Sequence, residues 1–168
     1  EHEDEVKKII KKNISGIAKI SSDRLLNELT KLISSKQFLK LFSDNFSLEI
    51  VELIFPQLKN MHLFKKLNNY AYENFKQNDF IFILSLMIID DSDNCEYFLY
   101  KFNLSNNQKK RIRFLKEFYS KSTDKNFYTE KNLSRIFYIH GKELLNDLLN
   151  FMIFLSKRNE KKLIKLKE

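Results

Sequence analysis

The chain has 168 residues, with 30 Lys or Arg and 22 Asp or Glu, which gives a formal net charge of +8. Two glycines and one proline leave few turn residues, so a sheet-rich fold is disfavoured and helices are favoured. The single cysteine, Cys95, excludes an intrachain disulfide and a cysteine-based zinc site. The longest apolar run, residues 80–89, is too short to span a bilayer, and the acidic residues 1–5 are unlike the start of a signal peptide. We therefore expect a soluble, cytoplasmic, all-α protein with no membrane partner.

The first half of the chain is expected to form helices joined by short polar links. Ser21 or Ser22 can cap a helix whose apolar residues recur at helical spacing. Ser47 can cap a later helix that Pro56 ends, because proline lacks the amide hydrogen that a continuing helix uses. The expected helices cover residues 4–13, 21–33, 38–42, 47–55 and 61–75.

The second half is expected to begin with a central apolar helix, capped by Asn78 or Asp79 and followed by a polar connection. Ser105 and Gln108 have the spacing of a capping box, in which each side chain satisfies a free amide at a helix start. Gly141 is expected to separate the last two helices. The expected helices cover residues 80–89, 95–102, 105–118, 130–140 and 142–158.

Three groups of basic residues concentrate the positive charge. Residues 20–100 hold eight basic and eleven acidic side chains, so the surplus lies outside them. Such clustering is what phosphate binding requires, whereas the alternative is that Lys-rich helix faces are only solvated. The groups are Lys7, Lys8, Lys11, Lys12 and Lys19; then Lys109, Lys110, Arg111, Arg113 and Lys116; then the basic residues of 157–167.

The segment 21–58, which ends in IFPQL, carries the most specific pattern in the chain. It resembles the RNA-binding region of bacterial CCA-adding enzymes and poly(A) polymerases. The matching positions are Ser22, Arg24, Glu28, Leu29, Lys31, Leu32, Ile54, Phe55, Pro56 and Leu58. Segments 103–112 (NLSNNQKKRI) and 135–150 (RIFYIHGKELLNDLLN) resemble later motifs of alphaproteobacterial members, with Ile139 and His140 departing from the pattern.

The resemblance implies an all-α, irregular bundle of about ten helices in a hooked neck, body and tail arrangement. It places a neck subdomain at 1–58 and a body with part of a tail at 59–168. It also implies that Arg24 and Glu28 brace the neck against a catalytic domain of the same polypeptide, although four-residue spacing equally suits a surface ion pair. The Gly-rich turn and the small sheet of that domain do not occur here, so the chain is expected to be a non-catalytic fragment.

The function implied is tRNA binding that positions the acceptor end for CCA addition. The basic groups would converge into one electropositive strip, and the whole enzyme would use two magnesium ions with CTP or ATP, whereas no cofactor or metal is expected in this chain. A poly(A) polymerase region and a non-enzymatic helical module that binds a protein remain alternatives. The residues expected to contact RNA are Lys7, Lys8, Lys11, Lys12, Lys109, Lys110, Arg113, Lys116, Lys157 and Lys161.

Other chemistry-bearing residues have simpler interpretations. Asp91 and Asp93 have the spacing of a metal-binding pair, but they follow a helix-like run without a glycine turn and are interpreted as a polar connection. Cys95 is expected to be a buried apolar residue. The three histidines, His2, His62 and His140, are expected at the surface or partly packed. Among the aromatic residues that could stack on bases, Tyr97, Phe98, Tyr100 and Phe102, the two phenylalanines are expected in the core.

Overall fold

The structure is a computed structural model that describes residues 2–121, 124–156 and 160–167. These residues form ten α-helices and five short 3-10 helices and contain no strand, so the prediction of an all-α fold of about ten helices is confirmed. The α-helices are α1 (His2–Asn13), α2 (Ser22–Ile33), α3 (Asn45–Ile54), α4 (Asn69–Asn74), α5 (Phe80–Ile88), α6 (Asn94–Lys101), α7 (Asn106–Lys121), α8 (Glu130–His140), α9 (Lys142–Leu155) and α10 (Glu160–Lys167). The 3-10 helices are η1 (Ile14–Lys19), η2 (Phe38–Ser43), η3 (Met61–Lys66), η4 (Phe75–Gln77) and η5 (Lys125–Tyr128).

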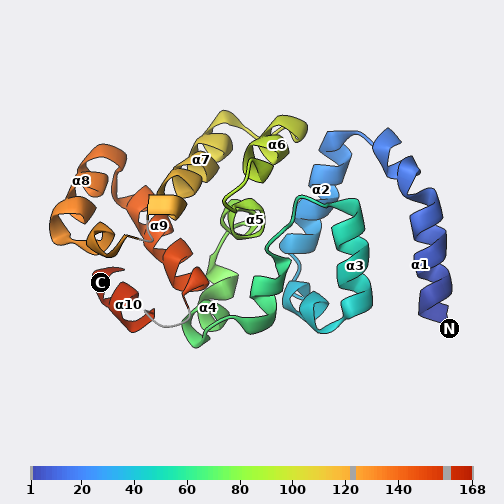
Figure 1. Cartoon of the computed structure of the whole chain (residues 1–168), viewed down its shortest axis with the longest axis horizontal. Coiled ribbons are helices and arrows are strands. Elements are labelled where there is room, and N and C mark those ends of the chain that lie inside the picture. Colours follow the sequence, from blue (N-terminus) through green and yellow to red (C-terminus); the bar gives the residue numbers. More distant parts are fainter. Residues whose placement is uncertain (1, 122–123, 157–159, 168) are drawn as a thin grey trace.

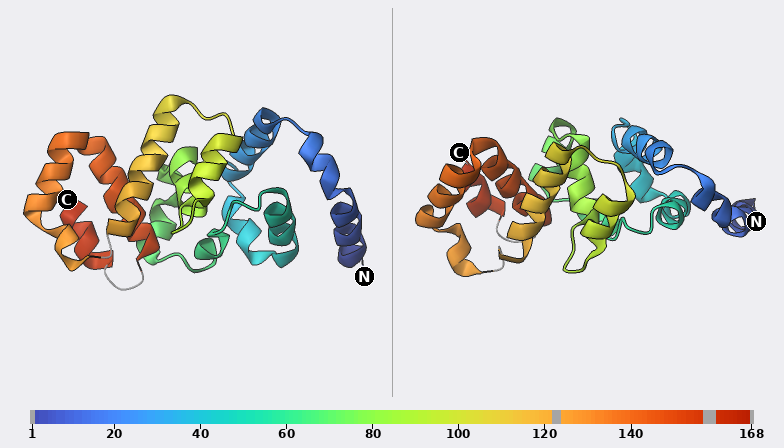
Figure 2. Two further views of the ribbon diagram at one scale, coloured as in Figure 1. Left: turned by 45° about the horizontal axis from the view of Figure 1, so that its top comes forward. Right: turned by 90° about the horizontal axis from the view of Figure 1, so that it is seen from above.

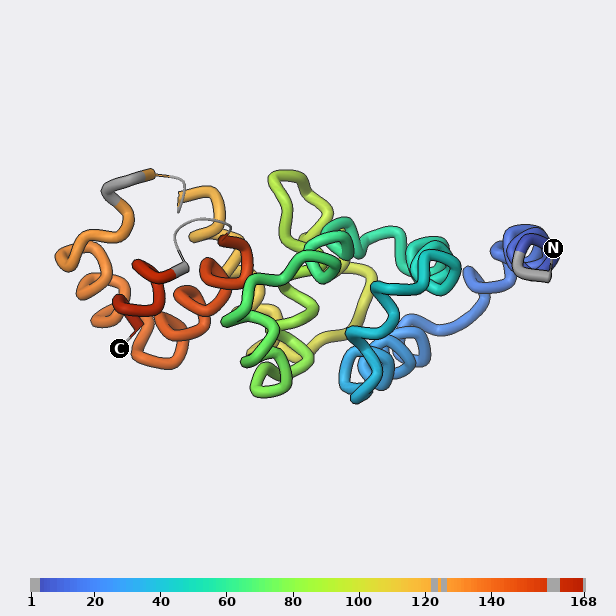
Figure 3. Tube along the Cα trace, turned by 90° about the horizontal axis from the view of Figure 1, so that it is seen from below, coloured from blue at the N-terminus to red at the C-terminus, as the bar shows by residue number. Residues whose placement is uncertain are grey.

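The helices are arranged along an elongated molecule (Figure 1). α1 stands at one end, α8 and α10 lie at the other, and α5 lies near the middle. Two further views show the same succession along the long axis (Figure 2), and the tube seen from below shows how far α1 projects from the helices that follow it (Figure 3). The first and last helices, α1 and α10, are therefore far apart.

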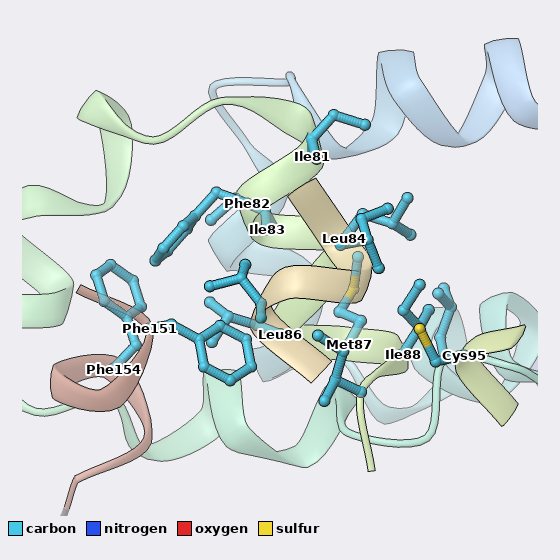
Figure 4. Packing of buried hydrophobic residues seen from close by; sticks show 14 of the residues in the cluster. Ile81, Phe82, Ile83, Leu84, Leu86, Met87, Ile88, Cys95, Phe151 and Phe154 are labelled. Atoms are coloured by element: carbon cyan, nitrogen blue, oxygen red, sulfur yellow. The ribbon is translucent and has the colours of Figure 1, made fainter. Parts of the chain in front are cut away.

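The core is built around α5. Residues 81–89 are all buried, as expected for the most apolar run of the chain. The ring of Phe82 packs edge-on against Phe154 of α9, with 5.2 Å between the ring centroids, and more loosely against Phe151 (Figure 4). Within α5 the hydroxyl of Ser85 donates to the Ile81 carbonyl at 2.7 Å, so this buried polar group is satisfied.

Two asparagines fasten the link that follows α3 to the end of α5. The Asn60 amide donates to the Ile89 carbonyl at 2.5 Å, and the Asn94 amide donates to the carbonyls of Gln57 at 2.7 Å and Ile88 at 3.0 Å. The bonds to Ile88 and Ile89 satisfy carbonyls that the end of α5 leaves without helical partners. One buried apolar cluster extends from Leu25 to Leu163 and so crosses position 58, while the expected division into subdomains at 58/59 stays a prediction.

Several local signals act as predicted. Ser21 caps α2 by accepting from the Arg24 amide at 3.3 Å, and Asp79 caps α5 by accepting from the Phe82 amide at 2.9 Å. The capping box at the start of α7 closes in both directions, at 3.3 and 2.9 Å. Gly141 joins α8 to α9 with φ 85° and ψ 169°, a conformation that is essentially restricted to glycine.

The single helix expected over residues 61–75 is wrong. The chain instead forms η3, two extended residues (Leu67 and Asn68), α4 and η4. The reason is Asn68, whose side chain caps α4 by accepting from the Ala71 amide at 2.8 Å and also donates to the carbonyls of Ile153 and Ser156 at 2.6 and 3.1 Å. A continuous helix would lose this connection to the end of α9.

Two other expected boundaries also change. Ser47 does not cap α3, because Asp44 lies at the cap and accepts from the Phe46 amide at 3.0 Å while the Ser47 hydroxyl donates to the same carboxylate. The helix expected over 142–158 ends at Leu155, where Ser156 takes an extended backbone, and the separate helix α10 was not predicted. The last residue of that expected helix, Arg158, lies outside the described residues.

Candidate nucleic-acid interface

The three basic groups lie at successive positions along the molecule. The first is on α1 and η1 at one end, the second is on α7, and the described part of the third is on α10 at the opposite end (Figure 1, Figure 2). An RNA that contacted all three would have to lie along the long axis. A single strip formed from them stays a prediction at the level of side chains.

One face of α1 and η1 attaches this segment to the rest of the protein. Lys7, Ile10, Ile14 and Ile17 are half-buried and recur every three or four residues, which is the spacing of one helical face. The Lys7 ammonium lies 3.0 Å from the Glu49 carboxylate of α3. It also lies 5.4 Å from the centroid of the Phe46 ring. Lys7 was expected to contact RNA, but its charge is already engaged by α3.

The other side of α1 presents cations to solvent. Lys8, Lys11 and Lys12 are exposed, and no ion-pair partner holds any of them in the part of the chain that the structure describes. Lys11 and Lys12 also lie in the last turn of the helix, where the helix dipole favours positive charge. These three ammonium groups can therefore bind phosphates without first breaking an ion pair.

The basic group of α7 divides into structural and available cations. Arg111, half-buried, donates to both carboxylate oxygens of Asp147 on α9, at 2.5 and 2.9 Å, and to Asp79 at 2.5 Å. Burial opposes the charge of the guanidinium, but the hydrogen bonds with Asp147 and Asp79 prevail and raise the pKa of Arg111 above its ordinary value. This side chain joins α5, α7 and α9.

Arg113, which was expected to contact RNA, is paired with α6. Its guanidinium donates to Glu96 at 2.9 and 3.1 Å, and this contact raises the pKa of Arg113. The three lysines of the group have no ion-pair partner in residues 2–121, 124–156 and 160–167. Lys110 is exposed, while Lys109 and Lys116 are half-buried. On α7, Lys109, Lys110 and Lys116 are thus available to a ligand, whereas Arg111 and Arg113 are engaged in contacts that stabilise the fold.

The C-terminal group is described only in part. Lys157 lies outside the described residues. Lys161 is exposed at the start of α10. Lys167 at the end of the same helix donates to the Tyr70 hydroxyl at 2.8 Å, so it holds α10 against α4.

Arg24 and Glu28 are both exposed on α2. Glu28 accepts a hydrogen bond from Lys31 at 2.9 Å, and this bond is the main cause that lowers the pKa of Glu28, with Arg24 contributing more weakly. The partner of Glu28 is therefore Lys31 and not the residue expected from four-residue spacing. Bracing of a catalytic domain by Arg24 and Glu28 stays a prediction.

The remaining candidates are accounted for by local packing. Asp90 accepts from the amide and hydroxyl of Ser92, at 3.0 and 2.7 Å, in the turn between α5 and α6. Cys95 is buried, and this burial raises the pKa of its thiol to about 12, as fits an inert core residue. His140 packs against the rings of Phe114 and Phe118, with centroids 4.8 and 5.7 Å away.

The described residues provide neither a metal-binding cluster nor a membrane-spanning helix. Across the described ranges, no group of three or more His, Cys, Asp and Glu side chains is placed to hold a metal ion. Asp91 and Asp93 are exposed in the turn after α5. The same part of the chain contains no helix with the length and apolar character needed to cross a bilayer.

Sequence reasoning missed the structural role of Arg111, which it counted only as part of a basic cluster. The signal that could have revealed it is the opposite charge of Asp147, which lies in segment 135–150, whereas Arg111 lies in segment 103–112. These two segments meet through this ion pair. The roles of Asn60 and Asn94 at the end of α5 carry no comparable sequence signal.

Comparison with known protein families gives a match over part of the chain. Residues 2–61 match a protein family described as the probable RNA and SrmB-binding site of polymerase A. Searches of curated proteins and of solved structures return no match. The matched residues comprise α1, η1, α2, η2 and α3 and end at the first residue of η3, so they include the exposed lysines of α1 but not α7 or α10. The match indicates an RNA-binding region in this part of the chain.

Proposed function

We propose that this chain is the tRNA-binding helical part of a CCA-adding tRNA nucleotidyltransferase, where it positions the tRNA acceptor end for addition of CCA. One observation carries the proposal: the residues that match an RNA-binding region of polymerase A include α1, whose outer side presents Lys8, Lys11 and Lys12 without ion-pair partners in the described residues. RNA is the partner that this combination favours.

The chemistry of α1 suits a folded RNA. Double-helical RNA presents its phosphate backbone and shape to a protein before it presents sequence, and lysine binds phosphate as a point charge with little geometric demand. Lys8 and Lys12 are one helical turn apart, about 6 Å along the axis. The inner face of α1 is held to α3 through Lys7 and Glu49. The phosphate contacts would thus be made from a helix that is anchored on its opposite side.

The second half of the chain supports an assignment to CCA-adding enzymes or poly(A) polymerases through the resemblance of segments 103–112 and 135–150, which does not separate the two. Arg111 and Asp147, one from each segment, are ion-paired between α7 and α9. This ion pair gives a physical reason for Arg111 to occur in segment 103–112 and for Asp147 to occur in segment 135–150. The last helices, α8 to α10, would extend the RNA contact along the long axis of the molecule.

The reaction itself would belong to a catalytic domain of the same polypeptide. Magnesium ions bound there would stabilise the attacking and leaving oxygens of nucleotide transfer. The acidic turn after α5 does not fit such a site, because the Asp90 carboxylate is engaged by Ser92 and Asp91 and Asp93 are exposed. The role of this chain is to hold the acceptor and its phosphates.

A poly(A) polymerase is the second candidate, and the wording of the matched family, which names polymerase A, favours it. The two candidates differ in the RNA that they retain. A CCA-adding enzyme should prefer the folded acceptor and T-stem of tRNA, whereas a poly(A) polymerase should accept an unstructured 3′ end equally well.

Filter binding of labelled tRNA at several salt concentrations tests the proposal, with poly(A) of equal length as competitor. About five phosphate contacts predict a log–log slope of affinity against salt of roughly −3.5 to −4.5. Preferential retention of tRNA supports the CCA-adding assignment, and equal competition by poly(A) supports the second candidate. Absence of salt-dependent binding contradicts both and leaves a helical module that recognises protein.

A further inference from the structure

The aromatic residues of α6 divide into two sets. Phe98 and Phe102 are 0% and 1% exposed, and their rings pack against each other with centroids 4.4 Å apart. Tyr97 and Tyr100 are 54% and 89% exposed. These tyrosines are three positions apart in the sequence, so they are neighbours on one helical face. Core packing therefore explains the positions of the phenylalanines, whereas the two tyrosines project mostly into solvent.

α6 and α7 form a helical hairpin whose two arms are joined by the ion pair of Glu96 with Arg113 (Figure 1). Tyr100 lies one helical turn from Glu96 towards the hairpin connection, and Lys109 lies one turn from Arg113 towards the same connection. Tyr100, Lys109 and the exposed Lys110 therefore all lie on the connection side of the ion pair.

The charge around this end of the hairpin is positive. Residues 97–116 contain six Lys or Arg and no Asp or Glu. The nearest acidic side chain in sequence, Glu96, is neutralised by Arg113, and the acidic turn that contains Asp90 precedes the opposite end of α6. An anion that approaches the tyrosines thus meets ammonium groups, because both acidic residues of the hairpin, Glu96 and Glu117, are paired with cations, Arg113 and Lys121.

We infer that the connection end of the α6–α7 hairpin binds unpaired RNA nucleotides, with bases stacked on Tyr97 and Tyr100 and phosphates held by Lys109 and Lys110. Every base has a π face that an aromatic ring can cover, and a basic surface beside the rings follows the backbone. Paired bases hide these faces within the double helix. The site rests on the proposed function, since it assigns to RNA binding a part of the chain that lies outside the matched residues 2–61.

A second exposed aromatic surface gives a matched control. Phe137, Tyr138 and Ile139 of α8 are 50%, 90% and 58% exposed, so Tyr138 is as accessible as Tyr100. α8 lies at the far end of the molecule from α1 and is separated in sequence from the α6–α7 hairpin (Figure 1). Tyr138 has the exposure of the proposed stacking residues without their lysine neighbours on α7.

Tryptophan substitution provides the test because the chain contains no tryptophan. Tyr100→Trp and Tyr138→Trp each introduce one fluorophore at an exposed aromatic position. Each variant of the full chain is titrated with a single-stranded oligoribonucleotide and with a blunt duplex of equal length, while binding is followed separately by filter retention. We expect saturating single-stranded RNA to quench the emission of Tyr100→Trp and the duplex to quench it much less. The emission of Tyr138→Trp should stay unchanged with either RNA.

Alanine substitution gives a second readout. Loss of base stacking in Tyr97→Ala/Tyr100→Ala should weaken single-stranded RNA binding by roughly 5- to 10-fold for each tyrosine, at the lower end for such sites because both rings are partly solvated. The salt slope should not change, since no charge is removed. Tyr97→Phe/Tyr100→Phe should keep the affinity.

The outcomes separate this inference from the proposed function. The stacking site is overturned, while the proposed function stands, if RNA binds without changing the emission of Tyr100→Trp and Tyr97→Ala/Tyr100→Ala keeps wild-type affinity. Failure of the wild-type chain to bind any RNA contradicts the proposed function and the stacking site together.

Discussion

Replacement of Arg111 tests whether the basic group of α7 is divided into structural and RNA-binding cations. Arg111→Met removes the guanidinium and keeps much of the side-chain length. The Arg111 side chain is 25% exposed and that of Asp147 is 19% exposed. Removal of one partner of a fully buried pair costs about 3–5 kcal/mol, and of an exposed pair about 0–1 kcal/mol. For this intermediate burial we expect a loss of about 2–3 kcal/mol in the free energy of unfolding, because the Asp147 carboxylate is left without its partner.

Urea denaturation followed by circular dichroism measures this loss, and thermal unfolding should show a lower Tm by about 2–4 °C for each kcal/mol in a chain of this size. A second substitution, Arg111→Met/Asp147→Asn, should recover part of the loss because it removes the stranded charge. The matched control is Lys110→Met, which should unfold within about 0.5 kcal/mol of wild type yet bind RNA more weakly. If Arg111→Met keeps wild-type stability and loses RNA affinity as Lys110→Met does, Arg111 is a surface cation and this division of the group is wrong.

Three further predictions concern stability and can be measured in the same urea assay. The thiol of Cys95 has its pKa raised from 9.0 to about 12 by burial, so the folded state keeps a proton that the unfolded state loses above pH 9. Stability should therefore fall by up to about 1.4 kcal/mol per pH unit between pH 9 and 12. Cys95→Ala should lack this component of the slope, and identical slopes for both proteins would contradict a buried thiol. Asn94→Ala should cost about 1–3 kcal/mol, because its amide donates to the Gln57 carbonyl in the link after α3 and to the Ile88 carbonyl at the end of α5, and a loss under about 0.5 kcal/mol would show that water replaces it. Gly141→Ala should cost about 1–3 kcal/mol because φ is 85° there, although no atom lies within 4 Å of the added Cβ, whereas Gly16→Ala, which meets no atom and has no positive φ, should cost far less.

The parts of the fold that could be predicted depend on short-range signals. Ser21, Asp79 and the Ser105–Gln108 pair all act on amides within three residues, and the apolar run of α5 can only be buried. The prediction over 61–75 failed because Asn68 bonds to carbonyls 85 and 88 residues later in the chain. No local pattern contains that contact.

The candidate site shows the same limit. Residue types located the basic groups, but the availability of each cation depends on partners elsewhere in the fold. Arg111 is engaged by Asp147, 36 residues away, and Lys7 is engaged by Glu49 of α3. Lys8, one residue further along α1, remains exposed. The choice between a structural and a ligand-binding cation is thus made by helix packing, which sequence spacing does not report.

The central claim is that the outer lysines of α1 bind RNA phosphates. It is tested most directly by the salt dependence of tRNA binding to Lys8→Gln/Lys11→Gln/Lys12→Gln, compared with Lys40→Gln/Lys66→Gln/Lys76→Gln, which removes three other exposed lysines and changes the net charge equally. Loss of three phosphate contacts should reduce the steepness of the log–log slope by about 2 to 3 and weaken binding by about 100-fold near 0.1 M salt. The control should keep the wild-type slope. Equal effects of the two triple substitutions would mean that tRNA responds only to net charge, and would contradict a specific role for α1.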